Sequence, residues 1–463
     1  GVGRNFLTLG AGEVAARLIA FGATVYLART LGASTYGVIV FATAILLYLS
    51  FITDCGVEML GIHDVAADRA GLFAALPEIL GARLLVATGL IAITVVVGLV
   101  ALPQPEGRIL AVYALTLLAV GVGTRWVHLG LEQPGQAVLA RVVTEGIAAV
   151  TIVAVVRTPA DLVRVPLAQL LGEVVGALLL LRLLPAGVER WRVRPRPARV
   201  QSLLSRSWPM VLHALLGLAI FNSDFIFLRI LRDSAALGYY AAAYTLISFF
   251  LNLGTAYTMS LIPALTRLRE DIPAARGLYD RSMAQVLAGV APVCVGGILV
   301  AGPIMGLIFG GGYVAAVEPL QILLLLLPLA YVRNVAQGGL LARGRQDLML
   351  RTVAWAAATN VVLNLLLIPR WGMAGAAWAT VATEGVRTLL AGRFVHRLGL
   401  PMTHPARFVR IVVAAGVMAG VVLLVSRAPL VAVIGAGGLT YVAMLALLGG
   451  IQFRRGAMPE LTV

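Results

Sequence analysis

The residues of this chain that could do chemistry are charged side chains inside long apolar stretches. Arg17 lies near the middle of the first such stretch, with Glu13 one helical turn before it, and Arg333 lies inside a later one, next to Asn334. A charge at the centre of a membrane-spanning helix costs about 2.5–3.5 kcal/mol and needs a counter-charge, water or a ligand. Because a guanidinium group binds phosphate oxygens in a bidentate way, Arg17, Arg333 and Asn334 are candidates for binding pyrophosphate. Pairing of each arginine with an acid is the alternative, and for Arg17 that acid would be Glu13.

An aspartate occupies another apolar stretch, at residues 208–231. Asp224 lies there two residues after Asn222. A buried carboxylate at that depth could bind a proton or a cation that is coupled to transport, so Asp224, Asn222 and Glu13 are candidates for ion coupling or for a cavity counter-charge. A static ion pair of Asp224 with Arg17 or Arg333 is the alternative.

A third set of charges lies toward one end of the apolar stretches. Asp54 and Glu58 are spaced i, i+4, as are Arg141 and Glu145, and Arg125 lies at the same end of the fourth stretch. On a helix this spacing places both members of a pair on one face. We interpret the five residues as a cytoplasmic gate, with a solvated structural face as the alternative.

Other chemistry is not indicated. The sequence contains no nucleophile–base set, no metal-ligand spacing and no phosphate-binding loop. Its two cysteines, Cys55 and Cys294, both lie in apolar stretches, which favours packing over a disulfide. The sequence therefore predicts neither an enzyme nor a metal site, and no cofactor apart from H⁺ or Na⁺ as a coupling ion.

The elements that must position these residues are about fourteen apolar stretches, each long enough to cross a bilayer as a helix. Hydrophobic residues make up 60% of the 463 residues, charged residues 12%, and the mean hydropathy is +0.95. The fold class predicted is all-α, a polytopic integral membrane protein. The first stretch runs straight into more spans, so it is not a cleavable signal peptide. The chain begins at Gly1 and not at Met, so we expect native residues before it.

Arginine sets the expected orientation. The formal charge of +15 comes from arginine alone, since the sequence has no lysine. In a soluble protein such a charge would indicate nucleic acid, but arginines beside membrane spans face the cytoplasm and anionic lipid. Placing the arginine-rich stretch 184–205 in the cytoplasm puts most arginines on that side. This predicts a multi-pass protein of the inner, cytoplasmic membrane with both termini in the cytoplasm, and no nucleic-acid partner.

Two short segments repeat. The run Leu27-Ala28-Arg29-Thr30-Leu31-Gly32 is followed by Tyr36-Gly37, and the run Phe227-Leu228-Arg229-Ile230-Leu231 by Gly238-Tyr239-Tyr240. Six spans separate the copies, so both run the same way through the membrane, as in transporters built from parallel repeats. We therefore expect an N-lobe at residues 1–184, a cytoplasmic arginine-rich linker at 185–205, a C-lobe at 206–398, and two further helices with a tail at 399–463. The two lobes would be pseudo-symmetric, with six helices each.

Several motifs resemble one family along nearly the whole chain. The most specific run is Gly344-Arg345-Gln346, Asn360, Asn364, Ile368-Pro369, Gly372, Gly375-Ala376-Ala377, Thr380 and Glu384. It resembles the eleventh and twelfth helices of the polysaccharide and O-antigen flippases, within the multidrug/oligosaccharidyl-lipid/polysaccharide exporter superfamily. Trp126, Gly130 and Glu132 resemble a stretch at that family's fourth helix, and Phe309-Gly310 with Tyr313 resembles its ninth-to-tenth hairpin.

The resemblance implies a function. It implies a flippase that carries a polyprenyl-pyrophosphate-linked oligosaccharide between leaflets by alternating access, for surface polysaccharide such as exopolysaccharide or O-antigen. Arg17 and Arg333 with Asn334 would then hold the pyrophosphate in a central cavity, and the last two spans could form a groove for the lipid tail. The expected partners are the bilayer, the lipid-linked glycan and a polysaccharide polymerase or ligase, with the flippase itself a monomer.

Two other functions remain open. A multidrug or cation antiporter of the same superfamily usually has twelve spans and an acidic cavity, so fourteen spans and Arg17 argue against it. A membrane glycosyltransferase or polysaccharide polymerase needs loops outside the membrane for sugar chemistry, and the outer loops here, such as 103–108 and 157–165, are short.

Overall fold

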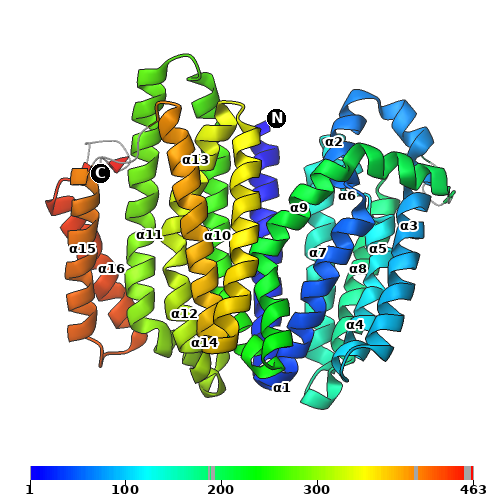
Figure 1. The fold of residues 1–463 in the computed structure, drawn as a ribbon, viewed down its shortest axis with the longest axis horizontal. Helices are drawn as coiled ribbons and strands as arrows, with labels where there is room; N and C mark the ends of the chain where they lie inside the picture. Colours follow the sequence, from blue (N-terminus) through cyan, green and yellow to red (C-terminus); the bar gives the residue numbers. More distant parts are fainter. Residues whose placement is uncertain are drawn as a thin grey trace. The chain divides into compact units, whose positions relative to one another are not determined.

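The computed structural model describes residues 2–185, 188, 193–194, 196–400, 405–452 and 460–461 (Figure 1). Long α-helices make up nearly all of it. The chain divides into two compact units: unit 1 contains Gly1–Leu218 with Asp233–Gly238, and unit 2 contains Ala219–Arg232 with Tyr239–Val463.

Unit 1 is built from the N-terminal helices. They are α1 (Val2–Asp54), α2 (Val57–Ala67), α3 (Arg69–Val100), α4 (Glu106–Ala114), α5 (Thr116–Val122), α6 (Arg125–Gly130), α7 (Pro134–Val155) and α8 (Arg164–Arg182), with the short 3₁₀ helix η1 (Pro159–Asp161) between α7 and α8. Most of α9 (Pro197–Leu231) also belongs to it. The helices α4, α5 and α6 lie within one apolar segment, Glu106–Gly130, which is interrupted at Leu115 and at Gly123–Thr124.

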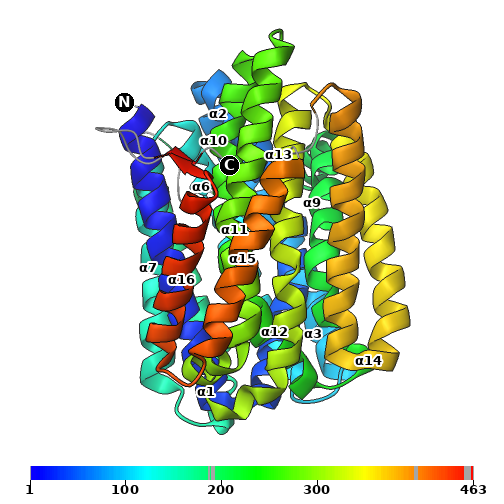
Figure 2. The same ribbon diagram turned by 90° about the vertical axis from the view of Figure 1, so that its left-hand side faces the viewer.

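Unit 2 holds the remaining helices. They are α10 (Ser234–Arg267), whose first turn belongs to unit 1, α11 (Ile272–Phe309), α12 (Val317–Leu324), α13 (Leu326–Ala342), α14 (Gln346–Arg397), α15 (Pro405–Leu424) and α16 (Leu430–Leu447). The 3₁₀ helix η2 (Gly311–Ala316) precedes α12, and β1 (Ile451–Gln452) pairs antiparallel with β2 (Glu460–Leu461). Figure 2 shows α15 and α16 side by side next to α11, where Tyr441 donates a hydrogen bond of 2.7 Å to the carbonyl oxygen of Ala288.

Within the described residues, twelve helical segments are long and apolar enough to span a membrane. Two of them are too long for one crossing: Gly12–Asp54 has 43 residues and Gln346–Arg397 has 52. At 1.5 Å per residue they would measure about 65 and 78 Å, against a hydrocarbon core of about 30 Å. Each is broken at a glycine with positive φ, 72° at Gly32 and 56° at Gly372, a conformation that glycine adopts without strain. Each therefore supplies two spans, and the predicted all-α, polytopic fold of about fourteen spans is confirmed.

The arginine-rich stretch of unit 1 differs from the expectation of a linker up to residue 205. Helix α9 begins at Pro197, so the last part of the arginine-rich stretch, including Arg199, is helical. Proline is accepted in the first turn of a helix because its missing N–H would have no partner there. Arg190 and Arg192 lie outside the described residues.

The repeated Gly/Tyr segments meet in unit 1. A Cβ atom on Gly37 would lie 1.7 Å from the carbonyl oxygen of Ser234, and one on Gly238 would lie 1.9 Å from that of Ala33. The backbones of α1 and of the first turn of α10 therefore touch where each carries its glycine. Beside this contact the Ser234 hydroxyl lies 2.9 Å from Glu106 Oε1. Small residues permit such close helix approach in membranes.

Candidate functional site

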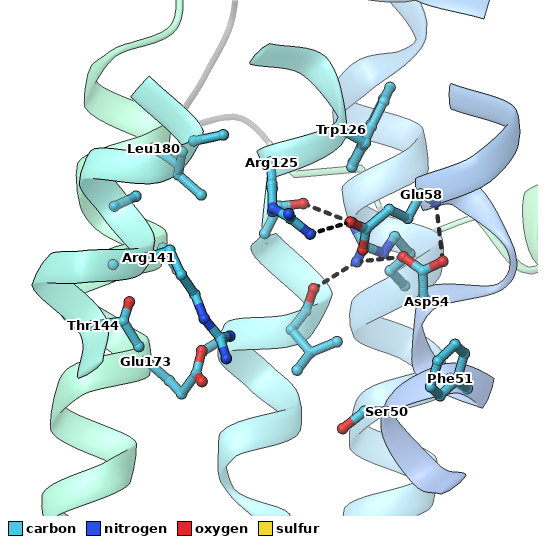
Figure 3. Close-up of a pocket in the computed structure, with 18 of the residues that line it drawn as sticks. Ser50, Phe51, Asp54, Glu58, Arg125, Trp126, Arg141, Thr144, Glu173 and Leu180 are labelled. Carbon is cyan, nitrogen blue, oxygen red and sulfur yellow. Dashed lines mark hydrogen bonds and ion pairs between the residues drawn. The ribbon is translucent and has the colours of Figure 1, made fainter. Parts of the chain in front are cut away.

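A cavity of about 580 Å³ lies within unit 1, and charged side chains from six helices line it (Figure 3). Four of the five residues predicted as a gate are among them: Asp54 at the end of α1, Glu58 on α2, Arg125 on α6 and Arg141 on α7. The fifth, Glu145, forms an ion pair of 2.8 Å with Arg141 one turn away. The fold thus gathers these residues around a single cavity.

Arg125 connects two acids from different parts of the chain. Its Nη1 lies 2.7 Å from Glu58 Oε1, and its Nη2 lies 3.1 Å from Glu13 Oε1. The helix α1 reverses direction at Gly32, so its last residues, near Asp54, return to the end where α1 began. Glu13, near that beginning, therefore lies within ion-pair distance of the same Arg125 that binds Glu58. Glu13 therefore meets Arg125, and not Arg17, which lies one turn away on its own helix.

Arg83 on α3 is a site residue that the sequence reasoning missed. Its guanidinium group donates to Asp54 at 3.0 Å and to the carbonyl oxygens of Val120 and Gly123 at 2.7 Å each. These carbonyls lie where α5 ends, at the break before α6, and backbone acceptors at a helix end need a substitute donor. The signal in the sequence was an arginine five residues into the apolar stretch that begins at Ile79.

Arg17 is exposed on the first half of α1 and has no ion pair within the described part of the chain. Of the three residues predicted to bind pyrophosphate, Arg17 is exposed, whereas Arg333 and Asn334 are buried.

Arg333 on α13 is buried and lies in a charge triad in unit 2. It forms an ion pair with Glu384 on α14, whose other carboxylate oxygen lies 3.0 Å from Arg387 Nη1. Arg333 also donates to the side-chain oxygen of Gln337 at 2.8 Å. Asn334, beside Arg333, is buried as well. Two guanidinium groups share one carboxylate, so the triad carries one net positive charge.

Asp224 on α9 is completely buried in unit 2, among polar groups without charge. Tyr240 donates to it at 3.0 Å, the amide groups of Asn364 and Asn360 at 2.5 and 3.3 Å, and the hydroxyl of Thr380 as well. Asn222, two residues earlier, is also buried. The i, i+4 pair of asparagines and the threonine of the family-like run thus converge on this carboxylate from both halves of α14.

A small cation could bind beside Asp224 if the amides of Asn360 and Asn364, which here direct N–H groups at the carboxylate, turned their oxygens toward it. Asn364 Oδ1 is buried and has no hydrogen-bond partner among the described residues. Carboxylate, amide and hydroxyl oxygens are the ligands that hard cations prefer.

A second cavity, of about 520 Å³, lies in unit 2 between α10, α11, α12, α15 and α16. Its lining is almost wholly apolar and includes Phe250, Val300, Leu324, Met418 and Val433. Four glycines border it, two on α11 and two on α16, at positions 296, 297, 437 and 438. This cavity suits a hydrocarbon chain and not a polar group.

Comparison with known proteins agrees with this architecture. The family model described as polysaccharide biosynthesis protein matches residues 2–269, more than half of the chain. A protein of Haloferax volcanii described as the probable flippase AglR is 30% identical over 177 residues, an alignment that spans 37% of this chain and 37% of that protein.

Solved structures share the fold at low sequence identity. The lipid II flippase MurJ in its inward closed conformation superposes with a TM-score of 0.81 at 13% identity, covering 95% of this chain and 98% of that one. An inward-facing multidrug resistance transporter of the MATE family, in the MOP superfamily, has a TM-score of 0.61 at 14% identity, covering 83% and 94%. The chain is therefore a member of the polysaccharide biosynthesis protein family, a multi-pass membrane protein with the fold of these solved transporters.

Proposed function

We propose that this protein is a flippase that carries a polyprenyl-pyrophosphate-linked oligosaccharide across the cytoplasmic membrane by alternating access, for cell-surface polysaccharide synthesis. The observation that carries the proposal is membership of the polysaccharide biosynthesis protein family by a chain that has a transporter fold. The names of the flippase relatives AglR and MurJ support the lipid-linked cargo. The physical need is clear, because a sugar head group cannot cross hydrocarbon without polar surroundings.

Arg17, Arg333 and Asn334 are the residues that we propose for the pyrophosphate. Arg17 is exposed, and Glu13 does not neutralise its charge, because Glu13 forms its ion pair with Arg125. Arg333 belongs to a triad with one net positive charge, which attracts an anion although Glu384 already holds its guanidinium group. We expect Arg17→Ala to abolish most of the transport. Arg108→Ala, at another exposed arginine of unit 1, is the matched control and should transport normally.

The apolar cavity of unit 2 is proposed to hold the lipid tail. It lies against α15 and α16, the two helices beyond the expected lobes. Gly437 lines this cavity, and a Cβ there would lie 2.8 Å from Val422. A bulky residue at Gly438, which has open space around it, should fill the cavity and slow transport of the full lipid.

Asp224 is proposed to couple transport to a H⁺ or Na⁺ gradient. A buried carboxylate whose neighbours are amides and hydroxyls can take up a proton, or a cation if the neighbouring amides turn their oxygens toward it. Asp224→Asn keeps the shape and removes the charge, so it should abolish the dependence of transport on the ion gradient while the protein still folds. Transport by the variant that still follows the imposed gradient would contradict this role.

The experiment that tests the function is deletion of the gene in its own host, followed by extraction of the polyprenyl-linked lipids. The proposal predicts accumulation of a pyrophosphate-linked oligosaccharide on the inner leaflet and loss of a surface glycan, both restored by the wild-type gene. Normal surface glycan with new sensitivity to cationic drugs would instead support a cation antiporter. One observation favours that second candidate: carboxylates outnumber arginines in the ion-pair network of the unit 1 cavity.

A further inference from the structure

The charges of the unit 1 cavity do not suit pyrophosphate. Three guanidinium groups line it, and three carboxylates line it as well: Asp54, Glu58 and Glu173. Two more acids stand behind the lining, where Glu13 and Glu145 pair with Arg125 and Arg141. An entering anion would meet five carboxylates against three arginines, each already held by at least one acid. Its phosphate oxygens would have to displace those carboxylates.

The same groups suit a ligand that carries hydroxyls. Arg125, Glu58 and Arg141 are 41%, 46% and 48% exposed, so their polar ends reach the cavity. Glu173 lines it and has no hydrogen bond or ion pair within the described part of the chain, and Figure 3 shows its carboxylate beside Arg141. Guanidinium donors and carboxylate acceptors thus both line the cavity. A hydroxyl can both donate and accept, so neighbouring hydroxyls can use both kinds of group at once.

Two further features point to a ligand with an apolar face and a polar edge. Phe51 is 39% exposed and borders the cavity, where its ring can cover an apolar surface of a ligand (Figure 3). The indole N–H of Trp126 is buried at the same cavity and has no acceptor among the described residues. A buried donor without a partner is costly, and a ligand oxygen could supply the acceptor.

We propose that the unit 1 cavity binds sugar residues of the cargo and that the pyrophosphate binds elsewhere. Sugar rings combine hydroxyl edges with apolar C–H faces, and a cavity of about 580 Å³ is within the range of roughly 300–1,000 Å³ that holds ligands of such size. The inference rests on the proposed function, because it assigns one part of that cargo to one cavity. Glu173 accepts hydroxyl hydrogens, Arg141 donates to hydroxyl oxygens, and Phe51 covers a ring face.

The test measures binding to the purified full chain by calorimetry. The main probe is the oligosaccharide released by mild acid from the polyprenyl-linked lipids of the deletion strain, and the other two are sodium pyrophosphate and tetraphenylphosphonium. Glu173→Gln should weaken binding of the oligosaccharide about tenfold, the effect of losing a hydrogen bond to a charged group, and leave binding of pyrophosphate unchanged. Phe51→Leu keeps every charge and should also weaken binding of the oligosaccharide. Glu78→Gln is the matched control, since Glu78 pairs with Arg196 at 2.6 Å in unit 1 but does not line the cavity.

The outcomes separate the two proposals. If the deletion strain accumulates no lipid-linked glycan, the proposed function fails and this inference fails with it. If the glycan accumulates but Glu173→Gln and Phe51→Leu bind it as wild type does, only the inference is overturned. Loss of tetraphenylphosphonium binding in Glu173→Gln, with binding of the oligosaccharide intact, would likewise overturn it and assign the cavity to cations.

Discussion

At the scale of single residues, buried arginines in this protein are held by more than one partner. Arg83 bonds a carboxylate and two backbone carbonyls in unit 1, and Arg333 bonds a carboxylate and an amide in unit 2. Each partner offsets part of the desolvation of the guanidinium group. The consequence is that removing one member of such a set leaves the others buried without their partner.

Arg83→Ala should therefore destabilise the protein by about 3 kcal/mol or more, because it leaves Asp54 and two carbonyl oxygens without their donor. Thermal unfolding in detergent measures this. Arg17→Ala is the control, since Arg17 is exposed and has no ion pair within the described residues, and it should unfold as wild type does. Equal midpoints for both variants would contradict the proposed role of Arg83.

The triad of unit 2 predicts an order of effects. Glu384→Gln leaves Arg333 and Arg387 facing each other without a carboxylate between them, whereas Arg333→Met leaves Glu384 still paired with Arg387. Like charges in a buried site repel strongly, so Glu384→Gln should lower the unfolding temperature more than Arg333→Met does. The reverse order would show that the net charge of the triad is compensated by another group.

At the scale of elements, glycines decide how the helices turn and touch. Gly32 and Gly372 adopt positive φ where α1 and α14 reverse, and Gly37 and Gly238 allow α1 and α10 to meet backbone to backbone. The reversal of α1 returns Asp54 to the end that carries Glu13, and so brings together the acids around Arg125. The charged cavity of unit 1 thus depends on a glycine that lies 19 residues after Glu13 and 26 residues before Glu58.

Gly37→Ala should reduce the yield of folded protein sharply, because its Cβ would overlap the carbonyl oxygen of Ser234 and the backbone would have to move. Gly22→Ala on the same helix is the matched control. A Cβ there meets nothing within 4 Å, and alanine is the better helix former by about 1 kcal/mol. Size-exclusion profiles in detergent distinguish the two variants, and a normal profile for Gly37→Ala would contradict the contact.

At the scale of the whole molecule, the arginine distribution should fix the orientation in the membrane. Segments rich in arginine stay in the cytoplasm, and the stretch 184–205 together with Arg267, Arg269, Arg343 and Arg345 would all lie on that side. In this orientation, the cavity of unit 1 with its charged residues would lie toward the cytoplasmic side, as expected for the five gate residues.

A reporter experiment tests this orientation. Alkaline phosphatase should be inactive, and green fluorescent protein fluorescent, when fused after Arg269 or after Arg345. Both results should reverse for fusions in the loop at η1, near Arg157. Active phosphatase after Arg345 would overturn the orientation and, with it, the assignment of the cytoplasmic gate.

The sequence by itself determined the class of fold, because each membrane-spanning helix must by itself be long and apolar enough to cross the bilayer. Hydropathy and span length are local properties of the sequence. It also indicated the family, through a resemblance in the run around Asn360, Asn364 and Thr380, and the family model matches residues 2–269. The sequence located most of the charges that line the unit 1 cavity as well. Only the tertiary structure decided the partners. Glu13 pairs with Arg125 and not with Arg17. Asp224 accepts hydrogen bonds from two amides and two hydroxyls and forms no ion pair with an arginine among the described residues. Arg83 donates to the backbone carbonyl of Gly123 at the break between α5 and α6. Such pairs join residues far apart in the chain, and which faces meet depends on how all the helices pack, which the spacing within one helix does not encode.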